Sequence, residues 1–88
     1  MKENKQIKPS QLFSKEIFIA ASYFVVSNRY CNKSALQRNF NINYHLATEV
    51  IEFLIEMKFI KCTDVVRYEV IQNDIPTMEE RLDRYYGG

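Results

Sequence analysis

Three side chains of this sequence have the chemistry of metal ligands or nucleophiles: Cys31, His45 and Cys62. They lie far apart in the sequence, and they lack the C-x-x-C or H-x-x-x-H pairing that usually marks a zinc site. Nothing in the sequence marks either cysteine as an activated nucleophile. The only two glycines are the last two residues, so there is no Gly-rich phosphate loop. We therefore expect no metal, no cofactor, no small-molecule substrate and no catalytic site.

Basic residues offer a different chemistry, which is contact with nucleic-acid phosphates, and their distribution is uneven. Residues 1–40 contain seven Lys or Arg and two Glu, a net charge of +5, whereas residues 41–88 contain five Lys or Arg and nine Asp or Glu, a net charge of −4. The total of +1 argues neither for nor against nucleic acid. A basic N-terminal half suits phosphate, and an acidic C-terminal half does not unless it faces away.

The composition bounds the class of protein. At 88 residues and 47% hydrophobic content, the chain forms one small domain with a genuine core. It has no apolar run long enough to span a membrane, and its first eleven residues lack the apolar segment of a secretory signal. We therefore expect a cytoplasmic protein, in which Cys31 and Cys62 are reduced, small and half-buried side chains.

The apolar pattern predicts the first two helices. Residues 1–9 are expected to be a flexible arm, and Ser10 is expected to cap a helix that ends near Asn28. A second helix is expected from about Lys33 to Asn39, capped by Asn32 or Ser34. The apolar face predicted for the first helix consists of Leu12, Phe13, Ile17, Ala20, Ala21, Phe24 and Val25.

Residues 41–43 predict a tight turn, because asparagine tolerates left-handed backbone angles. A third helix should follow from about Tyr44 to Met57, closed by Lys58, with a core-facing stripe of Ala47, Val50, Ile51 and Leu54. Residues 59–62 and 67–71 indicate two short strands joined by a hairpin turn at 63–66. A last helix should begin near Ile75, with Thr77 and Glu80 as a capping box. Its expected apolar stripe is Met78, Leu82 and Tyr85.

This order of elements is that of a winged helix-turn-helix. The expected fold class is mainly α with a small β-hairpin (α+β): a three-helix core, a wing and an extra C-terminal helix. The chain is accordingly divided into the arm at residues 1–9, a winged-helix domain at 10–74 and the C-terminal helix at 75–88. DNA binding is the first hypothesis for such an arrangement.

Three short motifs carry a more specific resemblance. They are Leu36-Gln37-Arg38-Asn39-Phe40, then Ile42-Asn43-Tyr44, and then the eight residues from His45 to Glu52. Together they make residues 12–60 similar to the gamma domain of the bacterial DNA translocase FtsK. That family shows a Leu-Gln-Arg-x-Phe helix, an Ile-Gly-Tyr turn and an Asn-Arg-Ala-Ala-Arg-Leu-Ile-Asp recognition helix. The motor domain that normally precedes this module is absent, so we expect a stand-alone relative.

The resemblance implies a winged helix that binds double-stranded DNA, as a regulator or accessory factor of a phage or mobile element. The second helix and the hairpin would hold the DNA backbone, and the third helix would lie at the major groove, with His45 and Glu49 near the base edges. A homodimer through the first or the last helix is a further expectation. The expected DNA-contacting residues are Lys33, Gln37, Arg38, Tyr44, His45, Glu49, Lys61 and Arg67.

The third helix also supports an alternative, because His45, Leu46 and Glu49 stand where the family carries Asn, Arg and Arg. Three carboxylates lie on its outward line and repel phosphates. The alternative is a protein-interaction module that keeps the winged-helix scaffold and has lost DNA readout. Leu46 and Phe53 would then face the partner, unless they pack beneath the arm or the last helix. The surface for that partner would be Leu46, Glu49, Glu52, Phe53 and Glu56.

Overall fold

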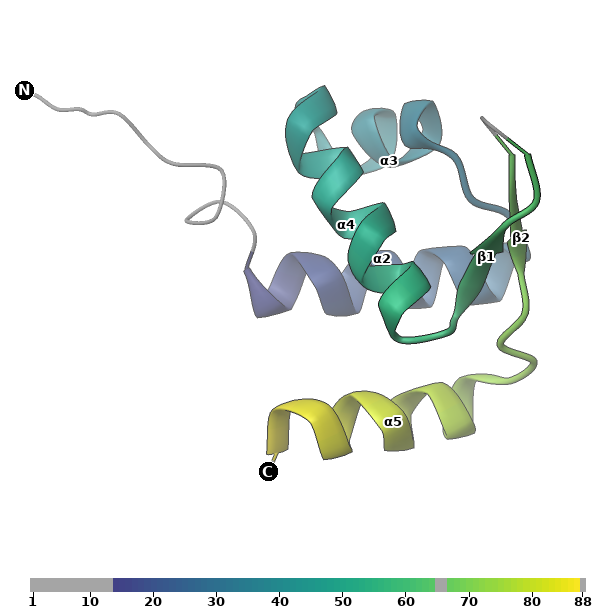
Figure 1. Ribbon diagram of the computed structural model, residues 1–88. Coiled ribbons are helices and arrows are strands. Elements are labelled where there is room, and N and C mark those ends of the chain that lie inside the picture. Colours follow the sequence, from purple (N-terminus) through teal and green to yellow (C-terminus); the bar gives the residue numbers. More distant parts are fainter. Residues whose placement is uncertain (1–13, 65–66, 88) are drawn as a thin grey trace, which may run out of the picture.

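The computed structural model describes residues 14–64 and 67–87 of the chain. They form four helices and one two-stranded antiparallel sheet (Figure 1), which confirms the mainly helical α+β class. The first described helix, α2, spans Lys15–Asn28, and the Ser14 hydroxyl oxygen caps it by accepting from the Ile17 backbone N–H at 3.1 Å. The expected start near Ser10 is wrong, because Ser14 has extended backbone angles. Residues 1–13, with the expected arm, lie outside the described residues.

Two helices follow, α3 at Lys33–Phe40 and α4 at Tyr44–Glu56. Asn32 caps α3 by accepting from Ala35 N at 2.7 Å, so the alternative cap, Ser34, is not used. Asn41 takes the left-handed conformation expected in the turn, with φ 53° and ψ 49°. Asn43, the last residue of the turn, has φ −83° and caps α4. Asn41 therefore provides the left-handed conformation of the turn, and Asn43 provides the N-cap of α4.

The hairpin consists of β1, Ile60–Cys62, and β2, Tyr68–Val70, which pair antiparallel with Ile60 opposite Val70. Both strands are shorter than the expected 59–62 and 67–71, but they lie within those ranges. Residues 65–66 of the hairpin turn lie outside the described residues. Because Phe59 and Ile60 are buried, the hairpin begins inside the core and extends outward from it.

The last helix, α5, spans Ile75–Gly87 and runs antiparallel to α2, on the side of α2 away from α3 (Figure 1). The expected capping box of Thr77 and Glu80 is wrong. The Asp74 carboxylate accepts from Thr77 N at 2.8 Å, so Asp74 is the cap. The Asp74 carboxylate, three residues before Thr77, pairs with a backbone N–H at the start of α5 that has no partner within the helix. The helix therefore begins before Thr77.

Every helix contributes to one core. The side chains of Phe18 on α2, Leu36 on α3, Leu54 on α4, Phe59 before β1 and Met78 on α5 all have 0% exposure. The predicted stripe on α4 is confirmed, since each of its four members is buried. Burial of side chains of this size stabilises the folded state by about 1.5–3 kcal/mol each before the entropy of ordering is counted.

Two expected apolar faces need correction. On α2, Ala20 is exposed and Phe18 is buried; the helix is apolar almost throughout, so its sequence does not distinguish the inner face. On α5, Tyr85 is 54% exposed, whereas Tyr86 is half-buried and packs edge-on against the Phe18 ring. Helical spacing from Leu82 allows either tyrosine, and the position of Phe18 decides between them.

Three helices end in the same backbone conformation without a glycine. Among the described residues, Arg29, Asn41 and Lys58 have positive φ, at 56°, 53° and 66°. After α4, Lys58 N donates to Ile55 O at 2.9 Å and Phe59 N donates to Leu54 O at 3.0 Å. These two bonds define a Schellman motif, in which the left-handed position usually carries glycine.

Candidate nucleic-acid interface

The best-defined polar contact between α3 and α4 joins two of the expected DNA-contacting residues. Lys33 Nζ donates to the Tyr44 hydroxyl at 3.0 Å and lies 4.6 Å from the centre of the Tyr44 ring. This hydrogen bond raises the pKa of Lys33 and lowers the pKa of Tyr44. Electrostatic interactions with Tyr68 and Glu52 also raise the pKa of Lys33.

The other expected contacts on α3 and α4 remain accessible to different extents. Arg38 and His45 are exposed, and Gln37 is half-buried. Arg38 is in the last turn of α3, and His45 is in the first turn of α4, next to Tyr44. Figure 1 places α3, the first turn of α4 and the outer ends of β1 and β2 on one side of α2. The expected residues of α3 and of the first turn of α4 therefore belong to one corner of the molecule.

The hairpin offers less positive charge than expected. Lys61 lies 3.7 Å from the carboxylate of Glu69, its cross-strand partner, and both side chains are more than half exposed. Such a pair contributes little to stability, but it neutralises Lys61. Arg67 is exposed, and its backbone N–H donates to Asp64 O at 3.4 Å. Arg67 is thus the hairpin residue that keeps a cation available.

The outward face of α4 is acidic along most of its length. Glu52 and Glu56 are exposed, and Glu49 is half-buried. One oxygen of Glu49, Oε1, is buried and has no hydrogen-bond partner. A buried carboxylate oxygen without a partner is unfavourable. Only the first turn of α4, with Tyr44 and His45, lacks a carboxylate on this face.

The apolar part of the alternative partner surface is not exposed. Leu46 has 3% exposure. Phe53 is half-buried, and its ring lies 4.7 Å from the Phe18 ring and 5.4 Å from the Tyr85 ring. Phe53 thus packs against the last helix, as one of the expected possibilities; the other, packing beneath the arm, lies outside the described residues. The alternative surface is thus reduced to Glu49, Glu52 and Glu56.

Arg29, the residue that follows α2, has a structural role. Arg29 Nη1 donates to the backbone carbonyl of Gln72 at 2.8 Å, which ties the end of α2 to the segment between β2 and α5. Gln72 is itself buried, and its side-chain oxygen accepts from Arg81 Nη1 at 3.1 Å. The sequence signal for this network is weak, because its members lie far apart in the chain.

The cysteines and the histidine do not form a site. Cys31 is buried, and burial raises the pKa of its thiol to about 12. Cys62 is exposed, contrary to the expectation of half-burial, because it lies at the outer end of β1, where the hairpin has left the core. Its Sγ donates to Asp64 O at 2.8 Å. Within residues 14–64 and 67–87, no three His, Cys, Asp or Glu side chains lie close enough to hold a metal ion.

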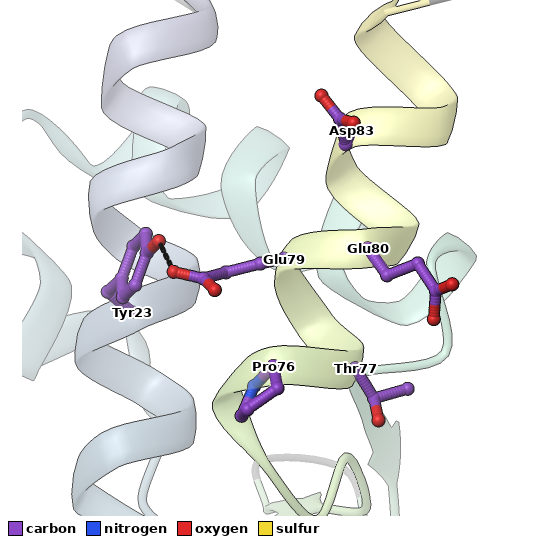
Figure 2. Close-up of a pocket in the computed structure, with 6 residues that line it drawn as sticks. All are labelled: Tyr23, Pro76, Thr77, Glu79, Glu80 and Asp83. Atoms are coloured by element: carbon purple, nitrogen blue, oxygen red, sulfur yellow. Dashed lines mark hydrogen bonds between the residues drawn. The ribbon is translucent and has the colours of Figure 1, made fainter.

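A shallow hollow of about 570 Å³ lies between α2 and α5 (Figure 2). The Tyr23 hydroxyl donates to the Glu79 carboxylate across it. The residues around it are Tyr23, Pro76, Thr77, Glu79, Glu80 and Asp83. Three of these are carboxylates and none is a cation, so the hollow repels phosphate and does not extend the corner at Lys33.

Comparison of the chain with protein-family models, with curated proteins and with solved structures gave no match. In the part of the chain that the structure describes, no helix is long and apolar enough to cross a membrane.

Proposed function

We propose that this protein is a winged-helix protein that binds double-stranded DNA through α3, the first turn of α4 and the hairpin. The order of elements α2, α3, α4, β1 and β2, with a three-residue turn between α3 and α4, supports the winged helix-turn-helix. The single observation that carries the proposal is the contact between Lys33 and Tyr44, because it fixes a cation and an exposed ring where α3 meets α4.

In this proposal Lys33 and Arg38 contact phosphates beside α3, and Arg67 contacts the backbone from the hairpin. Such contacts position the protein without reading the sequence. His45, at the exposed start of α4, is the side chain closest to the base edges. The carboxylates further along α4 restrict the approach, because Glu52 and Glu56 would repel phosphates if α4 lay lengthwise in the groove. The DNA therefore meets the N-terminal end of α4.

The burial of Leu46 and the packing of Phe53 weigh against the alternative, an interaction module for a protein partner. That reading required an exposed apolar surface, and exposed apolar patches are what usually mark such sites. The acidic residues that remain are ordinary for a solvated helix face. The proposal of DNA binding therefore has the stronger structural support.

The test is fluorescence anisotropy with a labelled random-sequence duplex, at low and at moderate salt. We expect binding that weakens steeply as salt rises. Replacement of Lys33 or Arg38 by Ala should weaken binding uniformly across sequences and reduce the salt slope by about one unit each. Lys58→Ala is the matched control, since Lys58 is an exposed cation at the opposite end of α4. Absence of binding at low salt would refute the proposal.

A further inference from the structure

The side chain of Tyr44, where α3 meets α4, is unusually exposed for an aromatic residue. Tyr44 is 61% exposed, a larger fraction than that of any other large hydrophobic side chain in the described residues. It does not belong to the core cluster, and no other aromatic ring of the described residues packs against it. Its ring is therefore available to a ligand, apart from the position that Lys33 occupies.

The backbone at Tyr44 is fixed by hydrogen bonds, and its side chain contacts Lys33. Asn43 caps α4 by accepting from Leu46 N at 2.8 Å, and the Thr48 hydroxyl donates to the Tyr44 carbonyl at 3.0 Å. Lys33 then holds the hydroxyl at the outer end of the ring. An aromatic group fixed before binding loses little conformational entropy when a ligand packs on it. Tyr44 is preorganised in this sense.

A fixed ring beside a fixed ammonium group matches the chemistry of one nucleotide. An aromatic side chain stacks on the face of any base, and a lysine attracts the phosphate that follows it. In a continuous duplex both faces of each base are covered by neighbouring bases, so only an unpaired base can stack on a side chain. A second exposed ring, Tyr30, is 52% exposed, and its hydroxyl accepts a hydrogen bond from Asn32, which precedes Lys33.

The acidic face of α4 favours the same form of ligand. A duplex groove presents two phosphate chains to a helix that enters it, and α4 carries Glu52 and Glu56 on its exposed side. A single strand carries one phosphate chain, which passes the corner at Lys33 without following the rest of α4. The repulsion is therefore smaller for a strand than for a groove.

We infer that the corner formed by Lys33 and Tyr44 binds an unpaired nucleotide, with the base stacked on the Tyr44 ring and the phosphate beside Lys33. This inference rests on the proposed DNA binding and specifies its form. The preferred ligand is a duplex that carries a single-stranded overhang, because it supplies the phosphates of the proposed duplex contact and an unpaired base for the ring; an isolated single strand supplies the unpaired base and its phosphate. A blunt duplex would use the phosphate contacts alone.

The first experiment compares three labelled ligands by anisotropy at low salt: a short oligo(dT), a blunt duplex, and the same duplex with a dT overhang. We expect oligo(dT) and the overhang to bind more tightly than the blunt duplex. Tyr44→Leu should weaken binding of oligo(dT) about tenfold or more, which corresponds to about 1.4 kcal/mol. Tyr44→Phe, which keeps the ring, should bind close to wild type. Tyr85→Leu is the control for an equally exposed tyrosine on α5.

The second experiment detects stacking directly. The chain contains no tryptophan, so Tyr44→Trp introduces a unique fluorophore at the corner. We expect its emission to be quenched by oligo(dT) and to change little with the blunt duplex. This measurement also decides the matter if circular dichroism shows that Tyr44→Leu fails to fold.

The outcomes separate the two proposals. If the blunt duplex binds as tightly as oligo(dT), if Tyr44→Leu leaves the affinity for oligo(dT) unchanged, or if the emission of the Tyr44→Trp variant is not quenched, the stacking inference is overturned and DNA binding stands. If none of the three ligands binds at low salt, both are overturned.

Discussion

Replacing Lys58 by glycine should stabilise the protein. Lys58 follows the last turn of α4 with φ 66°, and its backbone N–H and that of Phe59 complete the Schellman motif. A residue with a β-carbon pays about 1–2 kcal/mol for left-handed angles. Glycine avoids that cost, but its greater conformational entropy in the unfolded chain lowers the free energy of unfolding by about 0.5–1 kcal/mol. The net gain expected for Lys58→Gly is about 0.5–1 kcal/mol.

The assay is urea denaturation followed by far-ultraviolet circular dichroism, with a thermal scan beside it. A gain of this size should raise the melting temperature by about 2–8 °C in a domain of this length. The slope of the urea dependence should not change, because the folded surface is the same.

Two controls isolate the backbone as the cause. Lys58→Ala removes the favourable charge at the helix C-terminus but keeps the β-carbon, so it should be neutral or slightly destabilising. Asn41→Gly changes a residue that already tolerates its φ of 53°, so its effect should be smaller than that of Lys58→Gly. The reasoning would be refuted if Lys58→Gly lowered the midpoint, or if Lys58→Ala stabilised the protein equally.

Three further predictions concern the core, the inter-element network and the thiols. Leu54→Ala should lower the free energy of unfolding, measured by urea denaturation, by about 2–5 kcal/mol, because Leu54 is fully buried. A loss smaller than that of a substitution at an exposed position would contradict the described packing. Arg29→Ala should lower the free energy of unfolding by about 1–3 kcal/mol and speed amide exchange in the segment after β2, because it removes the 2.8 Å hydrogen bond to the Gln72 carbonyl. The Arg29→Lys variant tests whether a positive charge alone keeps this stability. Cys62 should react with a maleimide in the folded protein while Cys31 reacts only on unfolding. The pKa of Cys31 is raised from 9.0 to about 12, so stability present below pH 9 should fall as the pH rises from about 9 to 12, and Cys31→Ala should remove this part of the alkaline loss.

Several features that local chemistry determines were predicted from the sequence, although the caps of α2 and α5, Ser14 and Asp74, were not. A short polar side chain before an apolar run caps a helix, and Asn32 does so. Asn41 occupies the left-handed turn for the same local reason, since asparagine accepts those angles. The stripe of α4 was predicted because apolar residues recur there with helical spacing between polar ones. In α2 that contrast is missing, and the buried Phe18 was overlooked.

The features that depend on distant segments could not be predicted. Whether Phe53 was exposed depended on where α5 packs, and only the fold shows Tyr85 against its ring. The tie from Arg29 to Gln72 joins the end of α2 to a segment beyond the hairpin. Lys33 and Tyr44 were both expected at the candidate site, but their contact requires the angle between α3 and α4. Side-chain type suggested the members of the site, and tertiary packing determined which of them meet.

The position of α5 has a consequence for how the chain folds during its synthesis. Met78 and Leu82 fill the core beside α2, yet they are translated after every other element that they contact. While they remain inside the ribosome, α2, α3 and α4 lack part of their apolar cover, and the Phe18 ring lacks its Tyr86 neighbour. Chains in this state expose surface on which chaperones and aggregation act. Cooperative closure of the domain must therefore wait until α5 has emerged.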